Sequence, residues 1–220
     1  MSRRKAIAAL SLLSAEQWGM VTAAQARWLN VSRVDIYRLL SDRVLEHVTG
    51  AARVYRLTGS PPDPELDPLR GAWLQLCGDR PARLRLNDPD AVTSHRSAAN
   101  ALRLGDVIAS VHEFYVVGRR QPCRVDLRLR GWGTLRRDEW QVAGGLPVCM
   151  AGRIVADLLA DREDESAVAG ICQDAVHEGL LDPARLASLA APHADAYGAA
   201  DAAALAARLL GANADAGEEG

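Results

Sequence analysis

Three side chains in the segment VSRVDIYRLL, residues 31–40, are of types that bind nucleic acid. Arg33 and Arg38 can bond bidentately to phosphate or to the edge of guanine, and Tyr37 lies between them in the sequence. Ser32 stands before them as a helix cap, where the free amides of the first turn can bind a phosphate. This spacing favours a helix that enters the DNA major groove. The alternative is an ordinary solvated helix in a small helical domain.

Two capping signals predict the helices that position these side chains. TAAQ at residues 22–25 and SRVD at residues 32–35 share one form, in which Ser or Thr caps the third amide and is capped in return. Two helices that begin ten residues apart form a helix-turn-helix. The second helix has an apolar seam that must pack inward, formed by Ile36, Leu39 and Leu40. The arginines and the tyrosine lie largely off this seam.

The segment RVLEHVTGAARVYRL, residues 43–57, alternates in a way that predicts two strands joined around residues 49–52. His47 and Arg53 stand near the tip of this hairpin. With a helix expected at residues 4–13, the order of elements is that of a winged helix. The predicted DNA-binding residues are Ser32, Arg33, Tyr37, Arg38, His47 and Arg53.

A proline-rich stretch predicts a domain boundary. GSPPDPELDP, residues 59–68, holds four prolines, which remove backbone donors and disfavour helix before them. We therefore expect a winged-helix domain at 1–58, a linker at 59–66, a second domain at 67–211 and a disordered acidic tail at 212–220.

The second domain mixes helical and strand patterns. Helices are expected at 67–77, 96–104, 153–160, 166–178, from Pro183 onward, and at 201–210, and strands at 113–118, 123–130 and 146–150. The predicted fold class is α+β: an N-terminal winged helix-turn-helix, then a mixed α/β domain with a C-terminal helical region.

The net charge of −2 is unevenly distributed. Residues 1–60 carry nine basic and four acidic side chains, a charge of +5, so the remaining 160 residues sum to −7. This asymmetry suggests that only the first part meets a polyanion. A second basic group on the expected strand 123–130 and before it is either a solvated sheet face or a surface for an acidic partner or DNA backbone. Its candidates are Arg119, Arg120, Arg124, Arg128 and Arg130.

Several kinds of chemistry lack their residues. Lys5 is the only lysine, so a P-loop, a Schiff base and a common nuclease core are excluded. The four cysteines form no C-x-x-C pair and the five histidines no H-x-x-x-H spacing, so we expect no metal and no cofactor. Ser94 and His95 are adjacent in sequence, which does not make a catalytic pair. With these residues missing, we expect that the protein is not an enzyme. The apolar run at residues 6–10 is too short for a signal peptide, and no stretch is long enough to cross a membrane. We therefore expect a cytoplasmic protein.

The chain resembles the AbiEi-family antitoxins of bacterial toxin–antitoxin systems. The resemblance lies in the run from VTAAQARWLNVSRVDIYRLL to VYRLTGSP (21–61), in TSHRSAANALRLGD (93–106), in GLPVCMAGRIVADLL (145–159) and in CQDAVHEGLL (172–181). It implies autoregulation, in which the protein represses its own operon by binding inverted repeats in the promoter. It also implies neutralisation of a nucleotidyltransferase toxin, with or without direct contact. The alternative is a ligand-responsive winged-helix transcription factor without a toxin partner.

Overall fold

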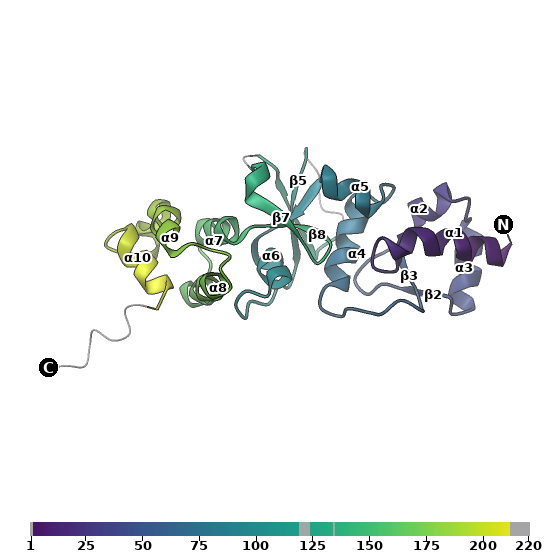
Figure 1. Ribbon diagram of the computed structural model, residues 1–220, viewed down its shortest axis with the longest axis horizontal. Helices are drawn as coiled ribbons and strands as arrows, with labels where there is room; N and C mark the ends of the chain where they lie inside the picture. Colours follow the sequence, from purple (N-terminus) through teal and green to yellow (C-terminus); the bar gives the residue numbers. More distant parts are fainter. Residues whose placement is uncertain (1, 119–123, 134, 212–220) are drawn as a thin grey trace. The chain divides into compact units, whose positions relative to one another are not determined.

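The computed structural model describes residues 2–118, 124–133 and 135–211, which fall into two compact units (Figure 1). The N-terminal unit comprises Met1–Ala91 with Gly144–Leu146, and the C-terminal unit comprises Val92–Ala143 with Pro147–Gly220. The expected acidic tail at 212–220 lies outside the described residues. In the described part, no helix is both long enough and apolar enough to cross a membrane.

The N-terminal unit contains the expected winged helix. Its elements are α1 (Arg3–Ala15), β1 (Met20–Thr22), α2 (Ala23–Trp28), α3 (Arg33–Ser41), β2 (Leu45–His47), β3 (Val54–Leu57), α4 (Asp67–Leu76) and α5 (Ala82–Asn87). The three strands form an antiparallel sheet in the order β1-β3-β2. The hairpin of β2 and β3 is the predicted wing, and β1 adds a strand that the sequence did not indicate.

Both predicted capping boxes are present at the starts of α2 and α3. The Thr22 hydroxyl accepts from the amide of Gln25 at 3.1 Å, and the Ser32 hydroxyl accepts from the amide of Asp35 at 3.1 Å. The side chains of the third residues bond back to the capping amides. Buried apolar residues of α1, α2, α3 and the two edge strands, β1 and β2, form one core. It includes Leu10, Val21, Ala26, Ile36, Leu39 and Leu45.

The expected domain boundary at 59–66 differs from the division that the structure shows. Helices α4 and α5 belong to the same compact unit as the winged helix. An ion pair buried on both sides joins Arg56 on β3 to Asp67 at the start of α4. The carbonyl oxygen of the Gln17 side chain accepts the amide of Ala82 at 3.2 Å. The prolines therefore bend the chain but do not separate two folded bodies.

The C-terminal unit is built on a five-stranded sheet in the order β6-β5-β4-β8-β7, in which β5 pairs parallel with β6 and β4 with β8. The strands of this sheet are β4 (Ala91–Thr93), β5 (His112–Val116), β6 (Leu127–Gly131), β7 (Trp140–Ala143) and β8 (Leu146–Cys149), and the first residues of β4 and β8, Ala91 and Leu146, are counted with the N-terminal unit. Its helices are α6 (His95–Leu102), α7 (Ala151–Ala160), α8 (Glu165–His177), α9 (Pro183–Ala190) and α10 (Ala202–Leu209), with three short 3-10 turns at Arg137–Glu139, Ala191–His193 and Asp195–Tyr197.

The α+β class and the C-terminal helical region are confirmed, but one strand was misplaced. The sequence predicts a strand from residue 123, whereas β6 begins at Leu127. Residues 124–126 form a bend and turn, and Val125 is fully exposed instead of facing the core. The alternation of apolar and charged residues continued through this turn, and alternation alone cannot distinguish a turn from a strand.

Candidate nucleic-acid interface and a buried polar network

Helix α3 turns its arginines and its tyrosine to solvent and Ile36 and Leu39 to the core, while Val34 is exposed as well. Arg33, Tyr37 and Arg38 are exposed, with 55% of Tyr37 and 73% of the Arg38 side chain accessible. Ile36 and Leu39 are buried, as the apolar seam predicts. Both basic residues of this helix are accessible to a ligand, as the sequence interpretation expects, and Arg38 Nη1 lies 3.8 Å from Asp35 Oδ1.

The exposed Arg33 is held against Tyr37, one turn further along α3. Its Nε and Nη2 atoms donate to the Tyr37 hydroxyl at 3.2 and 2.9 Å, and the guanidinium carbon lies 5.4 Å from the ring centroid. The hydrogen bond to Tyr37 raises the pKa of Arg33 above its ordinary value. The two residues form a single exposed cationic and aromatic group.

The acidic residue of this helix is turned away from the exposed face. Asp35 is mostly buried and its Oδ2 accepts from the amide and hydroxyl of Ser32, at 3.1 and 2.7 Å. The hydrogen bonds from Ser32 lower the pKa of Asp35, so the carboxylate stays ionised at the helix N-terminus, where an anion is favoured. A negative charge so placed opposes DNA less than one on the face of Arg33.

A groove of about 570 Å³ lies beside α3 in the N-terminal unit. Among the residues lining it are three arginines, two tyrosines and the capping serine, and none of its lining residues is acidic: Ala23, Arg27, Val31, Ser32, Arg33, Ile36, Tyr37, Arg53 and Tyr55. Arg27 and Tyr55 were not predicted as site residues. Arg27 is the basic residue in the last turn of α2, just before the turn of the helix-turn-helix. A basic residue at this place in the sequence could have indicated it as a site residue.

The wing contributes two further predicted residues. His47 is exposed at the end of β2, and its ring lies 5.4 Å from that of Tyr55 on β3. Arg53 is exposed just before β3 in the left-handed region, with φ of 60°, and its carbonyl accepts the amide of Ala23 at 2.9 Å. This bond fixes the position of the wing relative to α2. Arg56, two residues into β3, is instead buried in its ion pair with Asp67.

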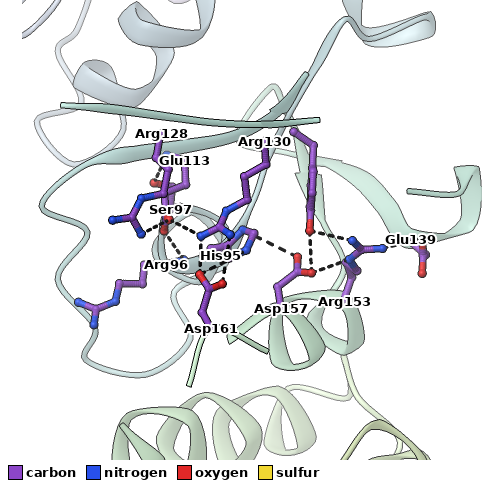
Figure 2. A network of polar contacts seen from close by, with 11 residues as sticks. His95, Arg96, Ser97, Glu113, Arg128, Arg130, Glu139, Arg153, Asp157 and Asp161 are labelled. Carbon is purple, nitrogen blue, oxygen red and sulfur yellow. Dashed lines mark hydrogen bonds and ion pairs between the residues drawn. The ribbon is translucent and has the colours of Figure 1, made fainter. Parts of the chain in front are cut away.

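The second predicted basic surface is not a surface of one sign. Arg124 pairs with Asp126, Arg128 lies 3.3 Å from Glu113, and Arg130 pairs with Asp161 (Figure 2 shows the last two pairs). The positive charges are therefore balanced by carboxylates that lie far away in the sequence or across a turn. These ion pairs favour the solvated sheet face for these three arginines, a partner or DNA-backbone surface there stays a prediction, and Arg119 and Arg120 lie outside the described residues.

The pairs of Arg128 and Arg130 belong to a polar network in the C-terminal unit, which Figure 2 shows around His95. His95 is buried there, with Nδ1 3.9 Å from Asp157 Oδ2 on α7 and Nε2 3.8 Å from Oδ2 of Asp161, the residue that follows α7. Burial, with the positive charge of Arg130, lowers the pKa of His95 to about 4. The imidazole is therefore neutral at neutral pH. Its backbone has φ of 51°, an uncommon conformation that histidine tolerates better than most residues.

A second part of the network joins α7 to β5. The Tyr115 hydroxyl donates to Asp157 Oδ1 at 2.7 Å and accepts from Arg153 Nη2 at 2.7 Å. Arg153 Nε also donates to Asp157 Oδ1 at 2.8 Å. Burial raises the pKa of Asp157 and of Tyr115. These hydrogen bonds tie α7 to β5.

Within the described residues, no group of three or more His, Cys, Asp or Glu side chains is arranged to hold a metal ion. Three of the cysteines lie in this part of the chain, and all three are free thiols: Cys77, Cys149 and Cys172. Burial raises the pKa of each of them, so the thiols are protonated and poor nucleophiles at neutral pH.

The fold and its exposed face define an α+β protein with an N-terminal winged helix. The solved structures similar to it include the RV2827C protein from Mycobacterium tuberculosis, with a TM-score of 0.52 and 17% identity, over 92% of this chain and 74% of that one. At that identity the likeness shows a shared fold alone. No family model and no curated protein matches the sequence.

Proposed function

We propose that the N-terminal unit binds double-stranded promoter DNA and represses transcription of the protein's own operon. The observation that carries this proposal is the groove beside α3, lined by Arg27, Arg33 and Arg53 without an acidic side chain among its lining residues. Arg38 extends the positive charge along the exposed face of α3. Winged helices place such a helix in the major groove and the wing on the adjacent backbone.

The residues take different roles in this geometry. Arg33 stands in the first turn of α3, where a recognition helix contacts base edges, and its preferred partner is guanine. Arg53 and His47 on the wing, with Arg27 at the end of α2, are suited to the phosphates on either side of the groove. Phosphate contacts give affinity on any sequence, whereas the base contact gives specificity.

We further propose that the protein is an antitoxin that neutralises a nucleotidyltransferase toxin encoded beside it, in the cytoplasm where promoter and toxin are present. This part is supported by the resemblance to AbiEi-family antitoxins in four sequence segments. The alternative remains a ligand-responsive winged-helix transcription factor. The neighbouring gene distinguishes them, because a nucleotidyltransferase favours the antitoxin and a metabolic enzyme favours the alternative.

Mobility-shift titration of the full chain on the DNA upstream of its own gene tests the repressor. We expect Arg33→Ala to weaken binding by about 1–3 kcal/mol and to relax the base preference at one position. Arg185→Ala is the matched control, because Arg185 is exposed on α9 in the C-terminal unit. Unchanged affinity of Arg33→Ala would contradict the base-reading role of Arg33. If the wild type shifts no DNA, the proposed repressor function is contradicted.

Co-expression with the neighbouring toxin tests the antitoxin. We expect the wild type to restore growth, and Arg33→Ala to restore growth while failing to repress a promoter reporter, because Arg33 lies only on the proposed DNA face. Toxicity that persists with wild-type protein at confirmed expression would contradict the antitoxin proposal and favour the transcription factor.

A further inference from the structure

We propose that Tyr37 is a specificity-determining residue that positions Arg33 to read one guanine. The inference rests on the proposed DNA binding by α3 and adds the means by which the base is selected. The exposed Arg33 makes two hydrogen bonds to the exposed hydroxyl of Tyr37, a contact that an ordinary solvated helix does not need.

A free arginine on a helix surface samples many rotamers, and fixing one of them on binding costs conformational entropy. Here Tyr37 lies at i+4 from Arg33, the spacing at which helical side chains meet. Its oxygen accepts from Nε at 3.2 Å and from Nη2 at 2.9 Å, while the ring lies beside the guanidinium at 5.4 Å. The hydrogen bonds fix the plane of the guanidinium, and the ring contact adds a cation–π attraction. The side chain is thus ordered before DNA arrives.

The way in which Tyr37 holds Arg33 decides which donors remain for the base. A guanidinium carries five N–H groups, and the tyrosine oxygen engages the one on Nε and one on Nη2. Both N–H groups of Nη1 and the second one of Nη2 remain. They form the end of the fork, which can donate to two acceptors side by side. Guanine presents two such acceptors in the major groove, O6 and N7, and no other base does so.

The mechanism separates specificity from affinity. Tyr37 carries no charge and releases no counterion, so its hydroxyl does not set the salt dependence of binding. Removing it should leave the charge of Arg33 on the DNA while lowering the advantage of guanine over other bases. A lysine at position 33 would likewise keep the charge but lacks the planar fork.

The experiment begins with duplexes that the full-length wild type selects from a random DNA library. Dissociation constants are then measured for the selected duplex and for its single-base variants. The proteins compared are wild type, Tyr37→Phe, Arg33→Ala, Arg33→Lys and the double variant Arg33→Ala/Tyr37→Phe. Tyr37→Phe keeps the ring and removes only the acceptor oxygen. Because Tyr37 is exposed, this variant is expected to fold, and its circular dichroism and melting temperature verify this.

Discrimination is the ratio of the dissociation constants for another base and for guanine at one position. We expect one position at which Arg33→Ala and Arg33→Lys lose most of this preference for guanine. At that position Tyr37→Phe should lower discrimination about two- to tenfold, the range of one net hydrogen bond, with an unchanged salt slope. The double variant should discriminate no less than Arg33→Ala alone. Equal discrimination by Tyr37→Phe and wild type, while Arg33→Ala loses it, would overturn this inference and leave DNA binding intact. Failure of the wild type to bind any duplex would overturn the proposed function, and this inference with it.

Discussion

Arg33 and Arg56 are arginines of the same N-terminal unit, but their surroundings give them different roles. Arg33 is exposed on α3 beside Tyr37, whereas Arg56 on β3 is buried against Asp67. The sequence indicated the first placement, because Arg33 lies off an apolar seam of helical period. It did not indicate the second, because the partner of Arg56 lies beyond the prolines and pairing between distant residues leaves no local pattern.

The wing arginine tests the electrostatic part of the proposed DNA interface. Arg53 is exposed at the wing and lines the groove beside α3. We expect Arg53→Ala to weaken binding on every duplex alike and to reduce the slope of log affinity against log salt by about one unit, because one phosphate contact is lost. Fluorescence anisotropy at several salt concentrations measures this slope. Loss of affinity on one sequence only would show that Arg53 reads a base instead.

The buried histidine of the C-terminal unit predicts a pH dependence of stability. The pKa of His95 is about 4 in the folded chain against 6.5 for an ordinary histidine, so the unfolded chain takes up the proton first. Stability from His95 is therefore complete above pH 6.5 and is lost as the pH falls from 6.5 toward 4. The raised pKa of Asp157 acts in the opposite direction, because its protonation favours the folded state.

His95→Asn isolates this effect, because asparagine tolerates the left-handed backbone and does not titrate. Urea unfolding gives the free energy of unfolding at each pH. Between pH 7.5 and pH 5 we expect this free energy to decrease by about 1–3 kcal/mol less in the variant than in the wild type. The control is His177→Asn, since His177 is exposed at the end of α8. An equal decrease in His95→Asn and wild type would contradict a buried neutral His95.

At the scale of elements, caps and apolar periods located the helices well. Asp182 and Asp201 cap α9 and α10, and the serine and threonine boxes begin α3 and α2. The missed elements are short: β1 and β4 have three residues each, β7 has four and α5 has six. Segments of that length complete too few periods to be recognised, and they form because neighbouring strands or helices supply their partners.

The cap of α3 is predicted to stabilise the helix that carries Arg33. Ser32→Ala removes the hydroxyl that accepts the Asp35 amide, and we expect a loss of about 1 kcal/mol in the free energy of unfolding. Ser41→Ala serves as the control, because Ser41 is exposed at the last residue of α3 and should change stability by less than about 0.5 kcal/mol. Chemical denaturation followed by circular dichroism compares them. Equal stability of Ser32→Ala and wild type would rule out a stabilising cap.

In the whole molecule, the division into units depends on ion pairs across the proline-rich segment, and the sequence of that segment does not indicate them. The pair Arg56–Asp67 is buried on both sides, and Arg70 adds a hydrogen bond of 2.8 Å to Asp63. Composition suggested a boundary at 59–66, but composition reports backbone preference and not the ion pairs that cross the segment. The charge asymmetry of residues 1–60 stays a prediction of a polyanion partner, whereas in the C-terminal unit the arginines of β6 are paired with Glu113 and Asp161.

Asp67→Asn tests whether this pair holds the N-terminal unit together. The change leaves the Arg56 guanidinium buried without its counterion and also removes the pair of Asp67 with Arg70. We expect the free energy of unfolding to fall by about 3–5 kcal/mol, visible as faster proteolysis of the N-terminal unit. Asp42→Asn breaks the exposed pair with Arg3, which is 3.1 Å long, and should cost about 0–1 kcal/mol. Similar proteolysis rates for the two variants would argue against a structural role for the buried pair.

Whether the winged helix binds DNA is best decided by the salt dependence of binding by the wild type and by the triple variant Arg27→Ala/Arg33→Ala/Arg53→Ala. These three arginines line one groove in the N-terminal unit. We expect the wild type to bind its upstream duplex with a log–log slope of about −3 to −4 per winged helix, and the triple variant to lower the magnitude by about two units, one for each of the phosphate contacts of Arg27 and Arg53. The same slope and affinity in both proteins, at equal thermal stability, would contradict this expectation.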